Sequence, residues 1–227
     1  MLPCFLESLR EVLKNRLPSL DHRKTFAAEL AYGRYRGPAP NDAQHAAVLV
    51  LLHIDPAAKR GVEPTLADYH FPLTLRVPQL TRHGGQISLP GGALNRDENP
   101  WQAAVREAEE ELGVRLSNIV PLGELTTTYV FASNYLVTPC VALLPSTPTW
   151  AAQESEVAEI FEMSLQHLIH PDQFSAPQRA RHGVLFRSPC IEHSGHQIWG
   201  ATGLILGDLI ANIHNVLSNS FQEKKNA

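Results

Sequence analysis

The stretch that decides the fold is GALNRDENPWQAAVREAEEELGV, residues 92–114. Asn99 and Gln102 have the spacing of a capping box, which predicts a helix that begins at Pro100. Gly113 is typical of the residue that ends a helix, because glycine adopts the left-handed conformation at low cost. Both ends of this helix are therefore predicted by local sequence.

The predicted helix has two different faces. Apolar residues recur at helical spacing and predict a core-facing stripe of Trp101, Val105, Ala108 and Leu112. Glu107, Glu110 and Glu111 gather on the opposite face, which we expect to be exposed. Like charges one turn apart cost about 0.2–0.5 kcal/mol per pair, so something should compensate them. The alternatives are a solvated acidic face helped by Arg106, or a bound divalent cation such as Mg²⁺.

The same stretch fits a known signature, G-x5-E-x7-R-E-U-x-E-E-x-G-U, in which U is aliphatic. The matching residues are Gly92, Glu98, Arg106, Glu107, Ala108, Glu110, Glu111, Gly113 and Val114. The segment resembles the Nudix box. This resemblance implies an α+β protein, an α/β/α sandwich with a mixed β-sheet. It also implies a diphosphatase, a pyrophosphohydrolase that cleaves nucleoside diphosphates linked to another moiety with Mg²⁺ or Mn²⁺ as cofactor.

The resemblance also implies roles for individual residues. Glu107 and Glu111 would be the principal metal ligands, and Glu110 a further or alternate ligand. Glu98 and Arg106 would position those ligands. Four more residues complete the implied site: Gly91 and Gly92, which let the backbone approach the metal, and Glu156 and Glu159, alternative sources of an extra carboxylate.

The segment just upstream, LTLRVPQLTRHGGQISLPGG (residues 73–92), is similar to a motif of the coenzyme A diphosphatase branch, L-L-T-x-R-[SA]-x3-R-x3-G-x3-F-P-G-G. The matching residues are Leu73, Thr74, Arg76, Gly85, Pro90, Gly91 and Gly92. Four positions depart from it: Pro72, Val77, Thr81 and Leu89. Arg82 stands one residue after the position of the second arginine, so Arg76 and Arg82 are the candidates to bind substrate phosphates.

Three functions of two classes, enzyme and binding module, follow. The first is hydrolysis of coenzyme A or its derivatives to 3′,5′-ADP and 4′-phosphopantetheine. The alternatives are hydrolysis of another nucleoside diphosphate derivative such as ADP-ribose, or a Nudix module that binds its ligand without cleaving it. The partner in each case is a small-molecule nucleotide.

The composition of the chain limits its fold and its partners. The 227 residues carry a formal net charge of −4 and 44% hydrophobic residues, which favours one folded domain without the basic field that nucleic-acid binding needs. We expect a helical extension over residues 1–44, a Nudix hydrolase domain over 45–218 and a polar tail over 219–227.

No apolar run reaches the roughly 20 residues of a membrane span. Three scattered cysteines and the absence of a secretory signal pattern predict a cytoplasmic protein. The oligomeric state stays open, with a homodimer as one alternative.

Hydrophobic patterns predict the remaining elements. Strands are expected near residues 46–54, 73–77, 120–130, 135–144 and 157–163. Residues 184–188 and 196–199 are expected to pair as a hairpin around residues 192–195. Amphipathic helices are expected over residues 2–17 and 201–217.

Overall fold

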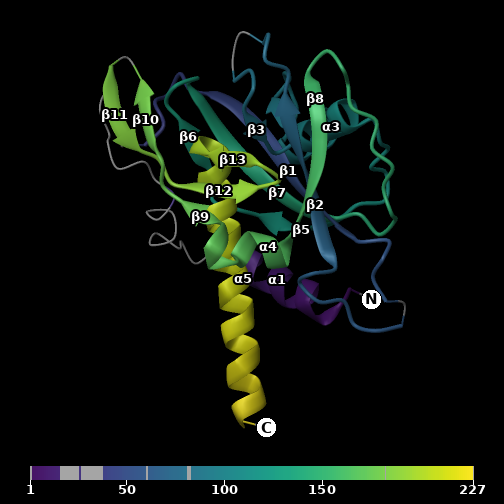
Figure 1. Cartoon of the computed structure of the whole chain (residues 1–227). Coiled ribbons are helices and arrows are strands. Elements are labelled where there is room, and N and C mark those ends of the chain that lie inside the picture. The colour runs from purple at the N-terminus through teal and green to yellow at the C-terminus, as the bar shows by residue number, and fades with distance from the viewer. Residues whose placement is uncertain are drawn as a thin grey trace.

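The centre of the protein is an eight-stranded mixed sheet (Figure 1). The computed structural model describes residues 2–15, 26, 38–59, 61–80, 83–181 and 183–226. The main strand order is β3 (Ile87–Ser88), β2 (Tyr69–Arg76), β1 (Gln44–Ile54), β7 (Tyr135–Leu143), β5 (Val120–Glu124). Three further strands extend it: β4 (Gly91–Ala93) pairs with β1, β6 (Thr128–Val130) with β7, and β8 (Val157–Ser164) with β2. β1 and β7 run parallel, and the other pairs are antiparallel.

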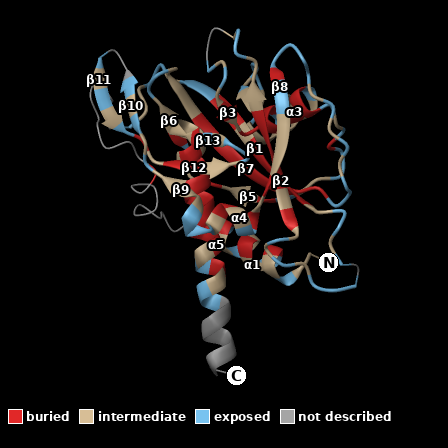
Figure 2. Ribbon diagram, in the orientation of Figure 1, coloured by how far each residue is buried: buried red, intermediate tan, exposed pale blue. Residues whose placement is uncertain are grey.

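Strand β1 separates two apolar cores because its side chains alternate between the two faces of the sheet. Leu49 and Leu51 pack with helix α3 (Pro100–Leu112), whereas Val50 and Leu52 lie in the larger core on the other face. Helices α1 (Cys4–Lys14) and α5 (Gly200–Asn226) contribute to that larger core. The buried residues therefore line both faces of the sheet (Figure 2), and the expected α/β/α sandwich is confirmed.

Helix α3 has the predicted ends. The Asn99 side chain accepts a hydrogen bond from the Gln102 amide, the Gln102 side chain accepts one from the Asn99 amide, and Gly113 is left-handed at φ +62°. The predicted exposed acidic face is partly wrong. Glu110 is exposed, but Glu111 is among the buried residues of the helix, at 3% of its accessible surface. A 100° periodicity separates the faces of a helix, but does not show which distant segments cover them.

The other helices are bounded differently from the prediction. α1 begins two residues later than the expected helix over residues 2–17 and ends at Lys14, while residues 16 and 17 lie outside the described part of the chain. α5 continues to Asn226, beyond the predicted end at residue 217. The C-terminal part of α5 extends away from the sheet (Figure 1). The domain boundaries at residues 44/45 and 218/219 stay predictions. No helix in the described part of the chain is long and apolar enough to cross a membrane.

The predicted hairpin between residues 184–188 and 196–199 is wrong. β11 (Val184–Arg187) instead pairs with β10 (Gln178–Arg181), and β13 (His196–Trp199) pairs with β12 (Cys190–His193). Each hairpin has its own tight turn with residues at positive φ, at Gly183 in the first and at Ser194 and Gly195 in the second. The remaining short elements, all absent from the prediction, are α4 (Leu165–Ile169), the 3₁₀ helix η1 (Pro171–Gln173) and β9 (Phe174–Ser175), which pairs with β12.

Candidate active site

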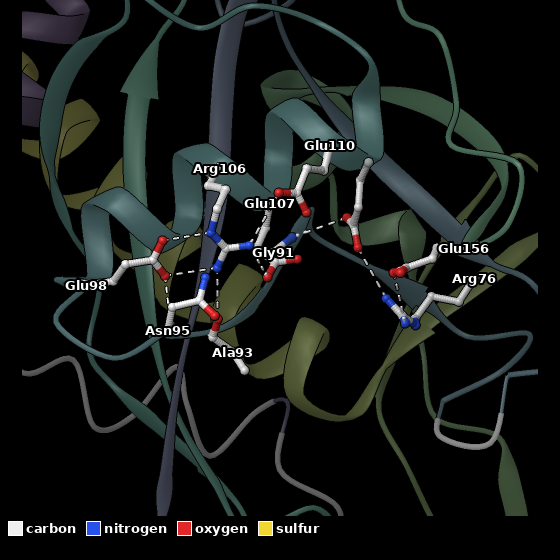
Figure 3. Close-up of polar contacts among 10 residues, drawn as sticks. Arg76, Gly91, Ala93, Asn95, Glu98, Arg106, Glu107, Glu110 and Glu156 are labelled. Carbon is white, nitrogen blue, oxygen red and sulfur yellow. Dashed lines mark hydrogen bonds and ion pairs between the residues drawn. The ribbon is translucent and has the colours of Figure 1, made fainter.

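The first half of the candidate site is a network around the Arg106 guanidinium (Figure 3). Its Nε donates to Glu98 Oε1 at 2.7 Å and its Nη1 donates to Glu107 Oε1, also at 2.7 Å. Glu110 Oε1 lies 3.6 Å from the same Nη1, and Nη2 donates to the Ala93 carbonyl at 3.1 Å. Hydrogen bonding to Arg106 lowers the pKa of Glu98 to about 2. One guanidinium thus holds the loop before α3 and two carboxylates of the helix.

The second half of the site is centred on the buried carboxylate of Glu111. Its Oε2 accepts a hydrogen bond from the Gly91 amide at 3.2 Å, and its Oε1 accepts one from Arg76 Nη1 at 3.2 Å. Burial raises the pKa of Glu111 to about 7, although Arg76 and the Gly91 amide act to lower that pKa. The charges of Glu107 and Glu156 raise it further. The site therefore carries more negative charge than its arginines neutralise.

Two glycines let β4 lie against α3. A side chain at Gly92 would collide with the Glu107 carboxylate, so only glycine leaves that carboxylate its place beside the strand. A side chain at Gly91 would collide with the Ala47 carbonyl and the Val48 backbone of the neighbouring β1. The Gly-Gly pair thus brings backbone amides and a carboxylate within contact distance of each other.

The donor chemistry of this cluster fits a hard divalent cation. Glu107, Glu110 and Glu111 offer carboxylate oxygens, the ligand type that Mg²⁺ and Mn²⁺ prefer, in a place with excess negative charge. Within the described ranges, however, no three His, Cys, Asp or Glu side chains are already grouped as a metal-ligand set. Glu107 and Glu110 face Arg106 while Glu111 faces Arg76, so a cation would have to draw these carboxylates toward a common point.

Most of the other residues singled out in the sequence lie around this cluster. Gly85 is left-handed, at φ +71°, in the turn between β2 and β3, and its amide donates to the Arg76 carbonyl at 3.0 Å. Glu156 Oε2 lies 3.9 Å from Arg76 Nη2, whereas Glu159 pairs with His196 at 3.7 Å. Arg82 lies outside the described residues.

The sequence offered no signal for the segment that covers the end of α3. The Ala151 amide donates to the Leu112 carbonyl at 2.9 Å, and the Gln153 amide to the Glu111 carbonyl at 3.2 Å. These bonds use carbonyls that the C-terminus of a helix leaves unpaired, and they bring Glu156 close to Arg76. Backbone hydrogen bonds of this kind depend on no particular side chain, so no sequence motif predicts them.

Comparison with known proteins agrees with this fold. Residues 69–183, half of the chain, match the model of the NUDIX domain. The chain is 33% identical over 174 residues to a Yersinia enterocolitica protein named uncharacterized Nudix hydrolase NudL. The aligned residues cover 76% of this chain and 83% of that protein. It is 33% identical over 171 residues to the Photorhabdus laumondii protein of the same name, covering 75% and 85% of the two chains.

A solved structure shares the fold. The MutT/nudix family protein from Enterococcus faecalis superposes with a TM-score of 0.50 over 93% of this chain and 73% of its own, at 18% identity. The family match and these relatives define a hydrolase of phosphoanhydride bonds. The chain belongs to the Nudix family and is a Nudix hydrolase, a pyrophosphohydrolase that acts on nucleoside diphosphate derivatives.

The burial of Glu111 predicts an unusual pH dependence of stability in the metal-free protein. Because burial raises the pKa of Glu111 from 4.5 to about 7, the folded protein binds more protons than the unfolded chain between these values. The group therefore lowers the free energy of unfolding as the pH rises through this window. In EDTA, Glu111→Gln should gain about 1–3 kcal/mol relative to wild type between about pH 4.5 and 8.

Urea unfolding at several pH values measures this difference. Glu110→Gln is the matched control, since it removes a carboxylate that is 60% exposed on the same helix. A difference between wild type and Glu111→Gln that stays constant across the pH range would contradict the raised pKa.

Proposed function

We propose that the protein hydrolyses the diphosphate bridge of coenzyme A or its derivatives to 3′,5′-ADP and 4′-phosphopantetheine. The observation that carries this proposal is that the upstream motif and the Nudix box meet at one carboxylate. Arg76 at the end of β2 and Gly91 in β4, both matching positions of the upstream motif, hold the two oxygens of Glu111. The motif is thus part of the reaction centre, where it can influence which diphosphate is cleaved.

The proposed roles follow from the contacts. Glu107 and Glu111 would hold Mg²⁺ or Mn²⁺, with Glu110 as a further ligand, and the bound cation would neutralise the diphosphate and lower the pKa of a water that attacks phosphorus. Glu98 and Arg106 orient Glu107 through the 2.7 Å contacts of the guanidinium. The Gly91 amide orients Glu111 in the same way.

The rest of the site would serve the substrate. Gly91 and Gly92 keep β4 close to β1 and to the Glu107 carboxylate, and Gly85 leaves the turn between β2 and β3 without a side chain, where a phosphate would approach the backbone. Arg76 and Arg82 would supply positive charge, and Glu156 is the candidate general base because it lies beside the Arg76 and Glu111 pair. We place the enzyme in the cytoplasm, where free cysteines such as Cys140 stay reduced.

Product analysis over a panel of nucleotides tests the proposal. Coenzyme A incubated with Mg²⁺ or Mn²⁺ should yield 3′,5′-ADP and 4′-phosphopantetheine, activity should disappear in EDTA, and it should return when either metal is restored. Faster cleavage of ADP-ribose than of coenzyme A would contradict the proposed substrate. Retention of intact coenzyme A by an inactive protein would favour the binding module instead.

Glu107→Gln should abolish most activity and leave the fold intact. The substitution removes metal-binding charge from a partly exposed side chain without opening a cavity, so we expect a loss of more than about a hundredfold at saturating Mg²⁺. Glu109→Gln is the matched control because Glu109 instead accepts the Leu116 amide on another side of the helix. Wild-type turnover in the Glu107 variant would remove the box from the mechanism.

Arg76→Ala should lower kcat/KM about tenfold to a hundredfold, the effect of losing one charge-assisted contact. Since the Arg76 guanidinium faces Glu111 and Glu156, we expect equal losses on coenzyme A and on 3′-dephospho-coenzyme A. Arg76→Lys should recover only part of the activity, because a lysine ammonium cannot contact both Glu111 and Glu156 as the guanidinium does. A loss confined to coenzyme A would instead place Arg76 at the ribose 3′-phosphate.

A further inference from the structure

A hollow of about 410 Å³ lies at the N-terminal ends of the parallel strands β1 and β7, beside the loop that leads from β4 into α3. The hollow is lined by Gln44 and His45 from β1, by Tyr135 from β7 and by loop residues that include Arg96. Gln44 and Tyr135 are direct neighbours across the parallel strands. The Tyr135 ring and the Gln44 amide therefore share one face of the sheet, whereas the His45 side chain points to the opposite face, and the Arg96 guanidinium belongs to the same lining.

The hollow adjoins the reaction centre. Ala93 and Glu98 belong to its lining, and both accept hydrogen bonds from Arg106, at 3.1 and 2.7 Å. Arg106 in turn donates to Glu107 at 2.7 Å (Figure 3). A single guanidinium thus separates the wall of the hollow from a proposed metal ligand.

The charge of Arg96 distinguishes it from the other arginines of the site. Arg106 is paired with Glu98 and Glu107, and Arg76 with Glu111. The exposed Arg96 guanidinium makes no hydrogen bond or ion pair with any residue that the structure describes, although Glu98 belongs to the same lining. Its positive charge is therefore available to an incoming anion.

We propose that this hollow binds the nucleotide half of the substrate. The half-buried Tyr135 ring would stack on the base, and Gln44, its neighbour on the same face of the sheet, would hydrogen-bond the polar edge of the base. Arg96 would bind the phosphate that lies outside the diphosphate bridge, which in coenzyme A is the ribose 3′-phosphate. The inference rests on the proposed function, because it assumes a diphosphate bound at Glu107.

Binding of product fragments, measured by calorimetry in Mg²⁺, tests the hollow without requiring turnover. Arg96→Ala should weaken binding of 3′,5′-ADP about tenfold or more and change that of AMP by less than about threefold. Tyr135→Ala should weaken both by about tenfold, since stacking does not depend on the 3′-phosphate. Arg115→Ala, which removes an exposed arginine beyond the opposite end of α3, is the matched control and should change neither.

The outcomes separate the hollow from the proposed reaction. Equal affinities of Arg96→Ala and Arg115→Ala for 3′,5′-ADP would overturn the proposal, as would a loss of 4′-phosphopantetheine binding in the Arg96 variant. A Kd effect of Arg96→Ala specific to 3′,5′-ADP supports the nucleotide site even if the wild type fails to hydrolyse coenzyme A. That failure would overturn the proposed reaction alone.

Discussion

The buried carboxylate of Glu111 is the constraint on which the site depends. A carboxylate taken out of water needs donors, and here they come from the Gly91 amide in β4 and from Arg76 in β2. These two strands occupy different parts of the sheet, so satisfying one side chain ties both of them to α3. The close packing of β4 against α3 also requires glycine at position 92, since a side chain there would displace the Glu107 carboxylate.

The parts of this arrangement that the sequence predicted are local ones. The capping box, the left-handed Gly113 and the apolar face of α3 each depend on residues within a few positions of one another. The sandwich fold and the identity of the acidic residues came from the resemblance to the Nudix box. The burial of Glu111 was missed because the groups around it, Arg76 and the segment near Ala151, lie 35 and 40 residues away along the chain.

The misassigned hairpin shows the same limit in another form. Residues 178–199 contain four short strands with similar alternation, and any two of them could pair on pattern alone. The structure is decided by Gly183 and Gly195, each in a turn at positive φ that joins strands adjacent in the chain. β9 adds to the second hairpin a contact that local sequence does not indicate, since two residues are too few for a recognisable pattern.

The distribution of charge explains how a protein with a net charge of −4 can accept a polyanion. Arg106 and Arg76 are paired with the protein's own carboxylates, so much of their charge orders the acidic cluster. A cation bound to that cluster would add to the attraction, and so would Arg96, which pairs with no carboxylate among the residues that the structure describes. A divalent ion can neutralise the bridge that is cleaved, whereas a phosphate farther along the substrate requires a fixed charge at its own position. The position of Arg96 away from the acidic cluster would thereby select substrates that carry a phosphate beyond the diphosphate bridge.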